Sequence, residues 1–281
     1  MPTAQLPPEA MATLTGLVGA GGVLVLSGAG LSTESGIPDY RGPSGAARPS
    51  TPMTYQAFTG SAANRRRYWA RSHLGWQVIA LAEPNAGHRA VTGLQDAGLL
   101  TGVVTQNVDG LHTAAGARDV VELHGDLARV RCLACGRISA RADLDRRLRA
   151  VNRAWRAKVL AVRPDGDVDL PESDLDAFRT VDCDGCGGML KPDVVFFGET
   201  VPADRVATCF ALLEQASSLL VLGSSLTVMS GYRFVLRAAE LGCPVAIVNA
   251  GTTRGDARAQ VRVDAPLGVV LPAMAERLCA R

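Results

Sequence analysis

Short apolar runs alternate with amphipathic stretches along most of the chain. Strand-like runs are expected at 23–27, 102–106, 119–123, 193–197, 218–223, 244–249 and 261–264. Between them, apolar residues recur at helical spacing at about 9–18, 63–82, 86–97, 203–216, 230–241 and 267–279. Strands that alternate with helices of this length predict an α/β fold, with a mostly parallel sheet covered by helices on both faces.

Two segments interrupt the alternation. Residues 42–62 are rich in Gly, Pro and Arg and too irregular for a regular element, and an aromatic helical pattern follows them. Residues 131–188 are rich in charge and bounded by cysteine pairs. We interpret both as insertions that form a second, smaller domain.

Composition narrows the class of protein. The chain has 281 residues, 47% of them hydrophobic, and a formal net charge of +2. This is the balance of an ordinary globular protein, with no reason to expect a nucleic-acid or membrane partner. No apolar run is long enough to span a bilayer, and the N-terminus lacks the features of a signal or transit peptide. We therefore expect a cytoplasmic protein; its oligomeric state is open, with a monomer favoured.

The cysteines give the most specific local pattern. Cys132-x-x-Cys135 and Cys183-x-x-Cys186 form two close pairs, each followed by glycine. Four thiolates in two such pairs predict a closed, tetrahedral, structural zinc site. Unrelated thiols and a redox pair are the alternatives, although a redox pair normally occurs singly. Three cysteines remain on apolar elements and are expected in the core: Cys209, Cys243 and Cys279.

A stretch rich in small residues follows the first apolar run. It covers 27–42 and reads SGAGLSTESGIPDYRG. Free backbone N–H groups in such a turn suit a phosphate, and glycine lets the backbone approach a ligand closely. The dinucleotide fingerprint G-x-G-x-x-G is broken, because Thr33 occupies the third glycine position and no acidic residue stands where that fingerprint binds ribose. The stretch indicates a dinucleotide site unlike that of an ordinary dehydrogenase.

Polar residues follow other predicted strands. Gln106, Asn107 and Asp109 come after one of them and offer amide donors and a carboxylate suited to a carboxamide and sugar hydroxyls. The plainer interpretation is an Asx-rich turn. Residues 223–225 and 249–251 end two more strands and complete a predicted cradle for phosphates and a second ribose.

The four histidines differ in their context. His124 ends a predicted strand, and imidazole exchanges protons near neutral pH, so it is the best candidate for a general base. His73 and His88 lie on helical patterns and are interpreted as structural. His112 is open to either interpretation.

The chain resembles the sirtuins, which are NAD-dependent protein deacylases, across nearly its whole length. The resemblance is carried by residues 28–32 (GAGLS), 36–42 (GIPDYRG), 105–112, 124–125 (HG), both cysteine pairs, 191–199 (KPDVVFFGE), 223–226 and 248–249. Tyr40, residues 67–71 (RYWAR) and the long segment between the cysteine pairs resemble class II, the sirtuin-4-like branch.

The resemblance implies a domain organisation. A Rossmann-like NAD-binding domain would comprise 1–42, 84–130 and 189–281. A cofactor loop and helical insertion would occupy 43–83, and a small zinc-binding domain would occupy 131–188.

The resemblance also implies the ligands and their residues. His124 would act as the catalytic base, with Asn107 positioning ribose and water. NAD, the co-substrate, would contact Gly28, Ala29, Gly30, Ser32, Ile37, Asp39, Tyr40, Arg41, Gln106, Asn107, Val108, Asp109, Gly223, Ser224, Ser225, Asn249, Ala250, Gly251 and Leu267. An acyl-lysine protein or peptide would pair as an added strand with Val195, Phe196, Phe197, Gly198 and Glu199. One structural Zn²⁺ would be held by Cys132, Cys135, Cys183 and Cys186.

The implied reaction consumes NAD. The acyl oxygen would attack the nicotinamide ribose and expel nicotinamide, and His124 would then take a proton from the ribose. The products would be lysine, nicotinamide and acylated ADP-ribose. A mono-ADP-ribosyltransferase that uses the same pocket and an inactive NAD-sensing binder are the alternatives.

The acyl group is left open by the sequence. Sirtuins that prefer succinyl- or malonyl-lysine carry a Tyr-x-x-Arg pair, and the matching positions are placed at Ser72 and Gly75, so that preference is not expected. The length and composition of 136–182 suggest the hypothesis that this insertion reaches the acyl channel.

Overall fold

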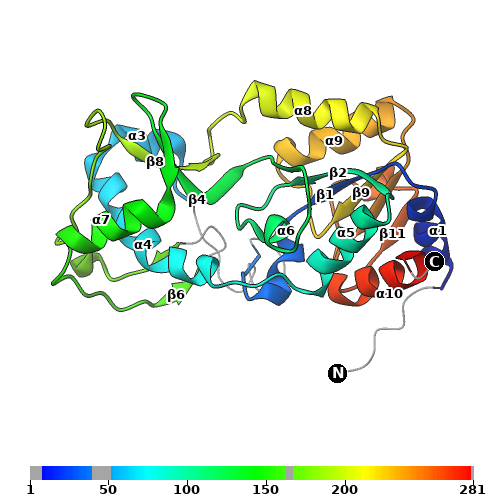
Figure 1. The fold of residues 1–281 in the computed structure, drawn as a ribbon, viewed down its shortest axis with the longest axis horizontal. Coiled ribbons are helices and arrows are strands. Elements are labelled where there is room, and N and C mark those ends of the chain that lie inside the picture. Colours follow the sequence, from blue (N-terminus) through cyan, green and yellow to red (C-terminus); the bar gives the residue numbers. More distant parts are fainter. Residues whose placement is uncertain (1–7, 40–51, 163–166, 280–281) are drawn as a thin grey trace.

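The computed structural model describes residues 8–39, 52–162 and 167–279. Figure 1 shows two parts, which we call the large lobe and the small lobe. The large lobe contains strands β1–β3 and β9–β11 with helices α1, α5, α6 and α8–α10, and the small lobe contains strands β4–β8 with helices α3, α4 and α7. Among the described residues, no helix combines the length and apolar character needed to cross a membrane.

The large lobe is built on one six-stranded sheet. Its order is β11-β10-β9-β1-β2-β3, and all neighbouring strands are parallel, which confirms the predicted fold class. The chain adds strands on one side of β1 and then on the other, so the topological switch point lies between β1 and β9. The strands are β1 (Val23–Ser27), β2 (Leu100–Thr105), β3 (Val120–Glu122), β9 (Ser218–Leu222), β10 (Val245–Val248) and β11 (Val261–Val263).

Helices cover both faces of this sheet because successive strand residues point to opposite sides. Val23 and Val25 of β1 join a core with residues of α1, α5 and α10, whereas Leu24 and Leu26 join a second core with residues of α8 and α9. The helices are α1 (Pro8–Gly19), α5 (Ala86–Asp96), α6 (Leu111–Ala114), α8 (Ala203–Glu214), α9 (Met229–Glu240) and α10 (Leu267–Cys279), with a short 3₁₀ helix η4 (Asp256–Arg258).

The small lobe contains a three-stranded antiparallel sheet and a two-stranded hairpin. The sheet has the order β5-β4-β8, and β6 pairs with β7. Both β4 and β8 lie in this sheet, so the boundaries expected at 130/131 and 188/189 cut through it. The elements are β4 (Gly125–Cys132), β5 (Ile138–Ala140), β6 (Ala161–Val162), β7 (Val168–Asp169), β8 (Leu190–Val194), α3 (Tyr55–Gly60), α4 (Ala62–Ala80), α7 (Arg141–Val151) and the 3₁₀ helix η3 (Glu172–Asp174).

Two local predictions in the small lobe were wrong. The strand expected at 193–197 ends at Val194 and pairs antiparallel with β4 through the contact of Val194 with Gly125. Phe196 lies beyond the end of the strand and packs on Phe58, with ring centroids 5.2 Å apart. Within 42–62, the described residues contain α3, whose first turn is capped by the Thr54 hydroxyl, which accepts from the Ala57 N–H at 3.2 Å.

Candidate functional site

A cavity of about 1290 Å³ opens at the switch point and is lined by both lobes. Every described residue that the sequence predicts for NAD or for the peptide lines this cavity, from the turn after β1 to the first residue of α10, Leu267. His124 lies in the same wall. Tyr40 and Arg41 lie outside the described residues. The resemblance implied this set of segments, and those that follow β1, β2, β9 and β10 meet because the carboxyl ends of parallel strands share one edge.

The glycines after β1 allow two chain segments to pack closely. A Cβ on Gly28 would lie 2.8 Å from Ser224 Cβ, and a Cβ on Gly30 would lie 2.9 Å from Gly223 Cα. The N–H groups of Gly28 and Gly30 donate to Leu222 O at 2.9 Å and Gly223 O at 2.8 Å. The free N–H groups expected in this turn are therefore not those of Gly28 and Gly30. Glycine is required here because the turns after β1 and β9 touch.

Other backbone donors remain beside these glycines. Within the described structure, the N–H groups of Ala29, Ser224 and Ser225 have no protein partner. All three residues line the cavity. Ala29 begins the 3₁₀ helix η1 (Ala29–Leu31), which η2 (Thr33–Ser35) follows. Unpaired N–H groups on adjacent turns suit an anionic ligand such as a diphosphate.

A hydrogen-bond network fixes the polar side chains of the cavity. Asn107 Nδ2 donates to Gly28 O at 3.1 Å and to Ser32 Oγ at 3.0 Å, and Ser32 Oγ donates to Asp109 Oδ2 at 2.7 Å. Burial raises the pKa of Asp109, against the hydrogen bonds from Leu111 N–H and Ser32. These side chains are held in place by the protein before any ligand enters.

His124 is held by two hydrogen bonds at the junction of β3 and β4. Its Nδ1 lies 2.9 Å from the backbone oxygen of Gln106, and its Nε2 lies 2.8 Å from Ser230 Oγ. Burial lowers the pKa of His124; the Gln106 hydrogen bond opposes this, and Arg205 and Arg233 lower the pKa further. A neutral imidazole in a cavity wall is the form a general base requires. Sequence reasoning missed Ser230, which carries no motif.

The segment predicted to bind the peptide is already bonded on several sides. Val195 N–H donates to His124 O at 2.8 Å, and Phe197 O accepts from Tyr55 N–H at 2.9 Å. Glu199 Oε2 accepts from Phe196 N–H at 2.8 Å, and Gln56 Nε2 donates to Gly198 O at 2.9 Å. A peptide strand added here would find only part of this backbone available.

The wall formed by α4 differs from the sequence prediction. Ser72 and Gly75 are buried and do not line the cavity, whereas Tyr68 does, and Arg71 follows Tyr68 with the same Tyr-x-x-Arg spacing. Asp167 from the insertion also lines the cavity, and Arg71 Nη2 lies 3.1 Å from Asp167 Oδ2 and 3.0 Å from the carboxylate of Asp169. The spacing is visible in residues 68–71 and could have identified this wall.

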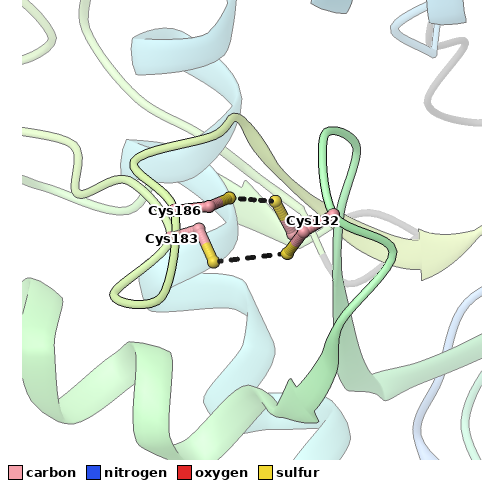
Figure 2. Close-up of side chains that lie close together, drawn as sticks. Cys132, Cys183 and Cys186 are labelled. Carbon is pink, nitrogen blue, oxygen red and sulfur yellow. Dashed lines mark hydrogen bonds between the residues drawn. The ribbon is translucent and has the colours of Figure 1, made fainter.

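The predicted metal ligands converge from two loops, as Figure 2 shows for Cys132, Cys183 and Cys186. The four sulfur atoms, including that of Cys135, all lie within 4.8 Å of one another. Cys132 Sγ and Cys186 Sγ are 3.5 Å apart, and Cys135 Sγ and Cys183 Sγ are 4.0 Å apart. A tetrahedron with Zn–S bonds of about 2.3 Å has sulfur atoms about 3.8 Å apart, so the cluster fits zinc.

The glycines that follow each cysteine pair explain the turn geometry. Gly136 and Gly187 adopt φ values of 74° and 69°, which favour glycine. Gly136 N–H donates to Cys132 O, and Gly187 N–H donates to Cys183 O. Outside the cluster, Cys209 is buried as predicted, whereas Cys243 is only partly buried and Cys279 is exposed at the end of α10, so the core prediction was wrong for the last.

The remaining histidines lie outside the cavity wall. His73 Nδ1 lies 2.6 Å from Asp145 Oδ1 inside the small lobe. His88 is fully buried in α5, as its helical pattern suggested, and its side chain takes part in the capping box of that helix. His112 is buried against Ser27, with Nε2 2.8 Å from Ser27 Oγ, so its role here is in packing.

Comparisons with known proteins identify a family for the chain. The model of the Sir2 family matches residues 28–230. NAD-dependent protein deacetylase 1 of Streptomyces coelicolor is 59% identical over 282 residues, covering 100% of this chain and 94% of that protein. The protein of the same name from Mycobacterium avium is 52% identical over 276 residues, covering 96% of this chain and 95% of that protein.

Solved structures show the same fold. A Sir2 protein with a p53 peptide and NAD⁺ superimposes with a TM-score of 0.72 at 29% identity, covering 96% of this chain and 97% of that chain. Sir2Tm bound to a propionylated peptide gives a TM-score of 0.73 at 27% identity, covering 95% and 98%.

Proposed function

The chain belongs to the Sir2 family, and from this premise we propose that it is an NAD-dependent protein lysine deacetylase. The observation that carries the proposal is a single cavity that brings a neutral His124 together with Asn107, Asp109 and unpaired N–H groups after β1 and β9. Relatives covering nearly the whole chain are named as NAD-dependent protein deacetylases, which supports the same activity here.

NAD would lie along the switch point. Its diphosphate would face the unpaired N–H groups of Ala29, Ser224 and Ser225, and its adenosine half would lie towards Asn249 and Leu267. The nicotinamide half would lie near Ile37, Asp39 and the network centred on Asn107. The remaining predicted contacts that belong to the described residues line the same cavity.

His124 would act as the general base. NAD supplies an electrophilic ribose carbon when it is bound. Nδ1 of His124 donates to the carbonyl of Gln106, so the basic nitrogen is Nε2, which can take a proton from a sugar hydroxyl. The Asn107 side chain is fixed by Gly28 O and Ser32 Oγ, so it can orient a sugar without reorganisation.

The cysteine cluster would hold one zinc ion with a structural role. Four thiolates fill a tetrahedral coordination sphere, so no position is left for a substrate. The loop with Cys132 and Cys135 connects β4 to β5, and the loop with Cys183 and Cys186 leads into β8. Zinc would therefore hold β4 and β8, and through them the Val195–Glu199 segment, in place.

The preferred acyl group is inferred from the side chains that α4 and the insertion contribute to the cavity wall. Asp167 and Tyr68 line the cavity, and Arg71 is shared by two carboxylates. These contacts support the hypothesis that the insertion reaches the acyl channel. Arg71, the basic residue of the Tyr-x-x-Arg spacing, is paired with Asp167 and Asp169 and is not part of the cavity lining, whereas Asp167 is. A carboxylate at this wall disfavours an acidic acyl group, so we expect acetyl and other neutral acyl groups to be preferred. Tyr40, residues 67–71 and the long segment between the cysteine pairs are what support placement in class II.

The test of the activity is mass spectrometry of wild-type protein with NAD and acetyl-lysine peptides. Acetylated ADP-ribose and free nicotinamide should form together, and His124→Asn should lower the rate by roughly 10²–10⁴-fold. Reactions without NAD are the control. Label transfer from NAD to protein that survives in His124→Asn, with deacetylation lost, would instead identify the ADP-ribosyltransferase alternative, which no observation of the site favours.

The test of the acyl wall is Asp167→Asn with acetyl, propionyl and succinyl peptides. Removing this charge takes away one of the two carboxylates that the described structure places on Arg71, so succinyl turnover should rise relative to acetyl turnover. Ser173→Ala, an exposed change in the same insertion, is the matched control. Identical preferences in wild type and Asp167→Asn would show that this carboxylate does not select the acyl group.

Cytoplasmic location and a monomeric state stay predictions of the sequence.

A further inference from the structure

Ser230 contacts the imidazole of the predicted base from a helix that no motif marks. It is the second residue of α9, and its Oγ lies 2.8 Å from His124 Nε2. Both residues line the cavity. The contact joins two segments that are 106 residues apart in the chain, so it depends on how α9 is placed.

Glycine places α9 close enough for this contact. Gly231 follows Ser230, and a Cβ at that position would lie 2.8 Å from Gln106 Cδ. The side chain of Gln106 is held in turn, because its Nε2 donates to Ser224 Oγ at 2.8 Å. The first turn of α9 thus packs directly on the residue whose backbone carbonyl binds His124 Nδ1.

The chemistry of the two partners sets the tautomer of His124. A backbone carbonyl oxygen can only accept a hydrogen bond, so the Nδ1 that contacts Gln106 O must carry the proton. In the neutral ring Nε2 is then an acceptor. The Ser230 hydroxyl, which can donate or accept, must therefore donate to Nε2.

We propose that Ser230 is a positioning residue for the base. Its hydroxyl donates a hydrogen bond to His124 Nε2 and so keeps that nitrogen oriented into the cavity. The expected effect of Ser230 on turnover rests on the proposed function, whereas its expected effect on the pKa of His124 does not. Nε2 has one lone pair, so a sugar hydroxyl that gives up its proton there replaces the Ser230 donor. Ser230 holds the ring in the reactive orientation until that exchange.

The charged groups around the imidazole act in the same direction. Burial lowers the pKa of His124, and Arg205 on α8 and Arg233 on α9 lower it further, while the Gln106 hydrogen bond raises it. A donor on Nε2 stabilises the neutral ring, so the Ser230 hydroxyl also lowers the pKa. Removing this hydroxyl should raise the pKa of His124 by roughly 0.5–1, which corresponds to one ordinary hydrogen bond.

The experiment compares Ser230→Ala with Ser230→Thr, which retains a hydroxyl, and with Thr208→Ala, an exposed change on α8 outside the cavity. The first measurement is a pH titration of histidine side chains by NMR in ¹⁵N-histidine protein without NAD or peptide. The His124 signal is assigned by its loss in His124→Asn. The second measurement is the pH dependence of kcat/KM for deacetylation.

Ser230→Ala should raise the pKa of the His124 signal, shift the acidic limb of kcat/KM to higher pH, and lower kcat/KM by roughly two- to tenfold. Ser230→Thr should restore the wild-type limb, and Thr208→Ala should match wild type throughout. An unchanged His124 titration in Ser230→Ala overturns the proposal, even if turnover falls. A shifted titration in a protein that shows no deacetylation would support the positioning role while refuting the proposed function.

Discussion

The two lobes stabilise their interiors in different ways. The large lobe buries two apolar layers against its sheet, and residues such as Leu220 and Val221 of β9 are 0% exposed. The small lobe also has an apolar core, but charged groups are buried inside it, with Arg141 only 1% exposed beside Asp145. Apolar burial stabilises both lobes, but in the second lobe the buried charges must also be matched by counter-ions and the clustered cysteine thiolates by a metal.

The difference matters for function because the cavity lies between the lobes. The large lobe contributes the turns after β1, β2 and β9, and the small lobe contributes the segment after β8 and the wall of α4. Changes in the small lobe should therefore affect the peptide and acyl group more than NAD. All three tryptophans belong to this lobe, so their fluorescence reports it selectively: Trp69, Trp76 and Trp155.

The largest expected effect is loss of the metal. Cys183→Ser removes one of four thiolates, and structural zinc contributes about 10–16 kcal/mol in small zinc-binding peptides, so the small lobe should unfold. Zinc should fall from one per chain, and tryptophan emission should shift to the red. Hydrogen exchange of β1 and β9 should stay slow, because apolar layers hold the large lobe.

The matched control for that variant is Cys279→Ser, since Cys279 is exposed and lies outside the cluster. It should keep one zinc per chain and native emission. Native emission in zinc-free Cys183→Ser would show that the small lobe does not need the metal, and the contrast between the lobes would fail at its main point.

A smaller effect is expected from the apolar layer of the large lobe. Phe234 of α9 is 1% exposed and packs on Phe210 with ring centroids 5.1 Å apart. Phe234→Ala should lower the free energy of unfolding by about 3–5 kcal/mol, through lost burial and the cavity left behind. This loss of stability is measured by urea unfolding, with hydrogen exchange of the β9 amides as the probe. An equal shift in the fluorescence midpoint would mean that the lobes unfold as one unit.

The buried arginine of the small lobe should matter slightly less. The Arg141 guanidinium lies 5.3 Å from the Trp69 ring centroid and 5.6 Å from that of Trp76, and it donates to Ser72 O at 3.1 Å. Arg141→Met should cost about 3 kcal/mol, the lower end for a broken buried pair, because Asp145 keeps other partners. Fluorescence-detected unfolding is the measurement, with the exposed change Arg146→Met as a control expected to leave the midpoint unchanged.

Much of the cavity was predictable from the sequence, because of the parallel sheet. Polar residues such as Asn107 and Ser225 follow strands whose carboxyl ends must meet, so strand order alone brings them together. Ser230 and Asp167 could not be found in this way. They reach the cavity through the packing of α9 on Gln106 and through the ion pair with Arg71.

The apolar run 193–197 shows a second limit. Its residues suit a buried strand in either the parallel or the antiparallel sheet, and their hydrophobic pattern does not indicate which of the two sheets the strand joins. The choice is made by pairing of Val194 with Gly125, where Gly125 has a φ of 88° and its missing side chain lets Asp193 approach. Such a long-range contact is not visible in local sequence.

The smallest expected effect is a pH dependence that belongs to the large lobe. Burial, with Arg89 nearby, lowers the pKa of His88 to about 4, and burial, with His88 nearby, lowers the pKa of His112 to about 3. Their ring centroids are 5.1 Å apart. Both are neutral when folded, whereas in the unfolded chain each takes up a proton below about pH 6.5. The unfolded state then binds more protons, so stability is unaffected above pH 6.5 and falls below it.

Between pH 6.5 and 5.5, the free energy of unfolding should fall by about 1 kcal/mol for each histidine, because the unfolded histidine is already half protonated at pH 6.5. The slope of the free energy of unfolding against pH is measured by urea unfolding at pH 7.5, 6.5 and 5.5, with hydrogen exchange of the β2 amides as the probe. Zinc content is checked at each pH. His112→Gln should lower stability at pH 7.5 but make the slope shallower by the contribution of one histidine, while His88 and His124, whose pKa values are also lowered, keep theirs. An unchanged slope in this variant would place the acid sensitivity outside the histidine pair. If the small lobe lost its native fluorescence first, with zinc still bound, the acid-sensitive charges would be those around Arg141 instead.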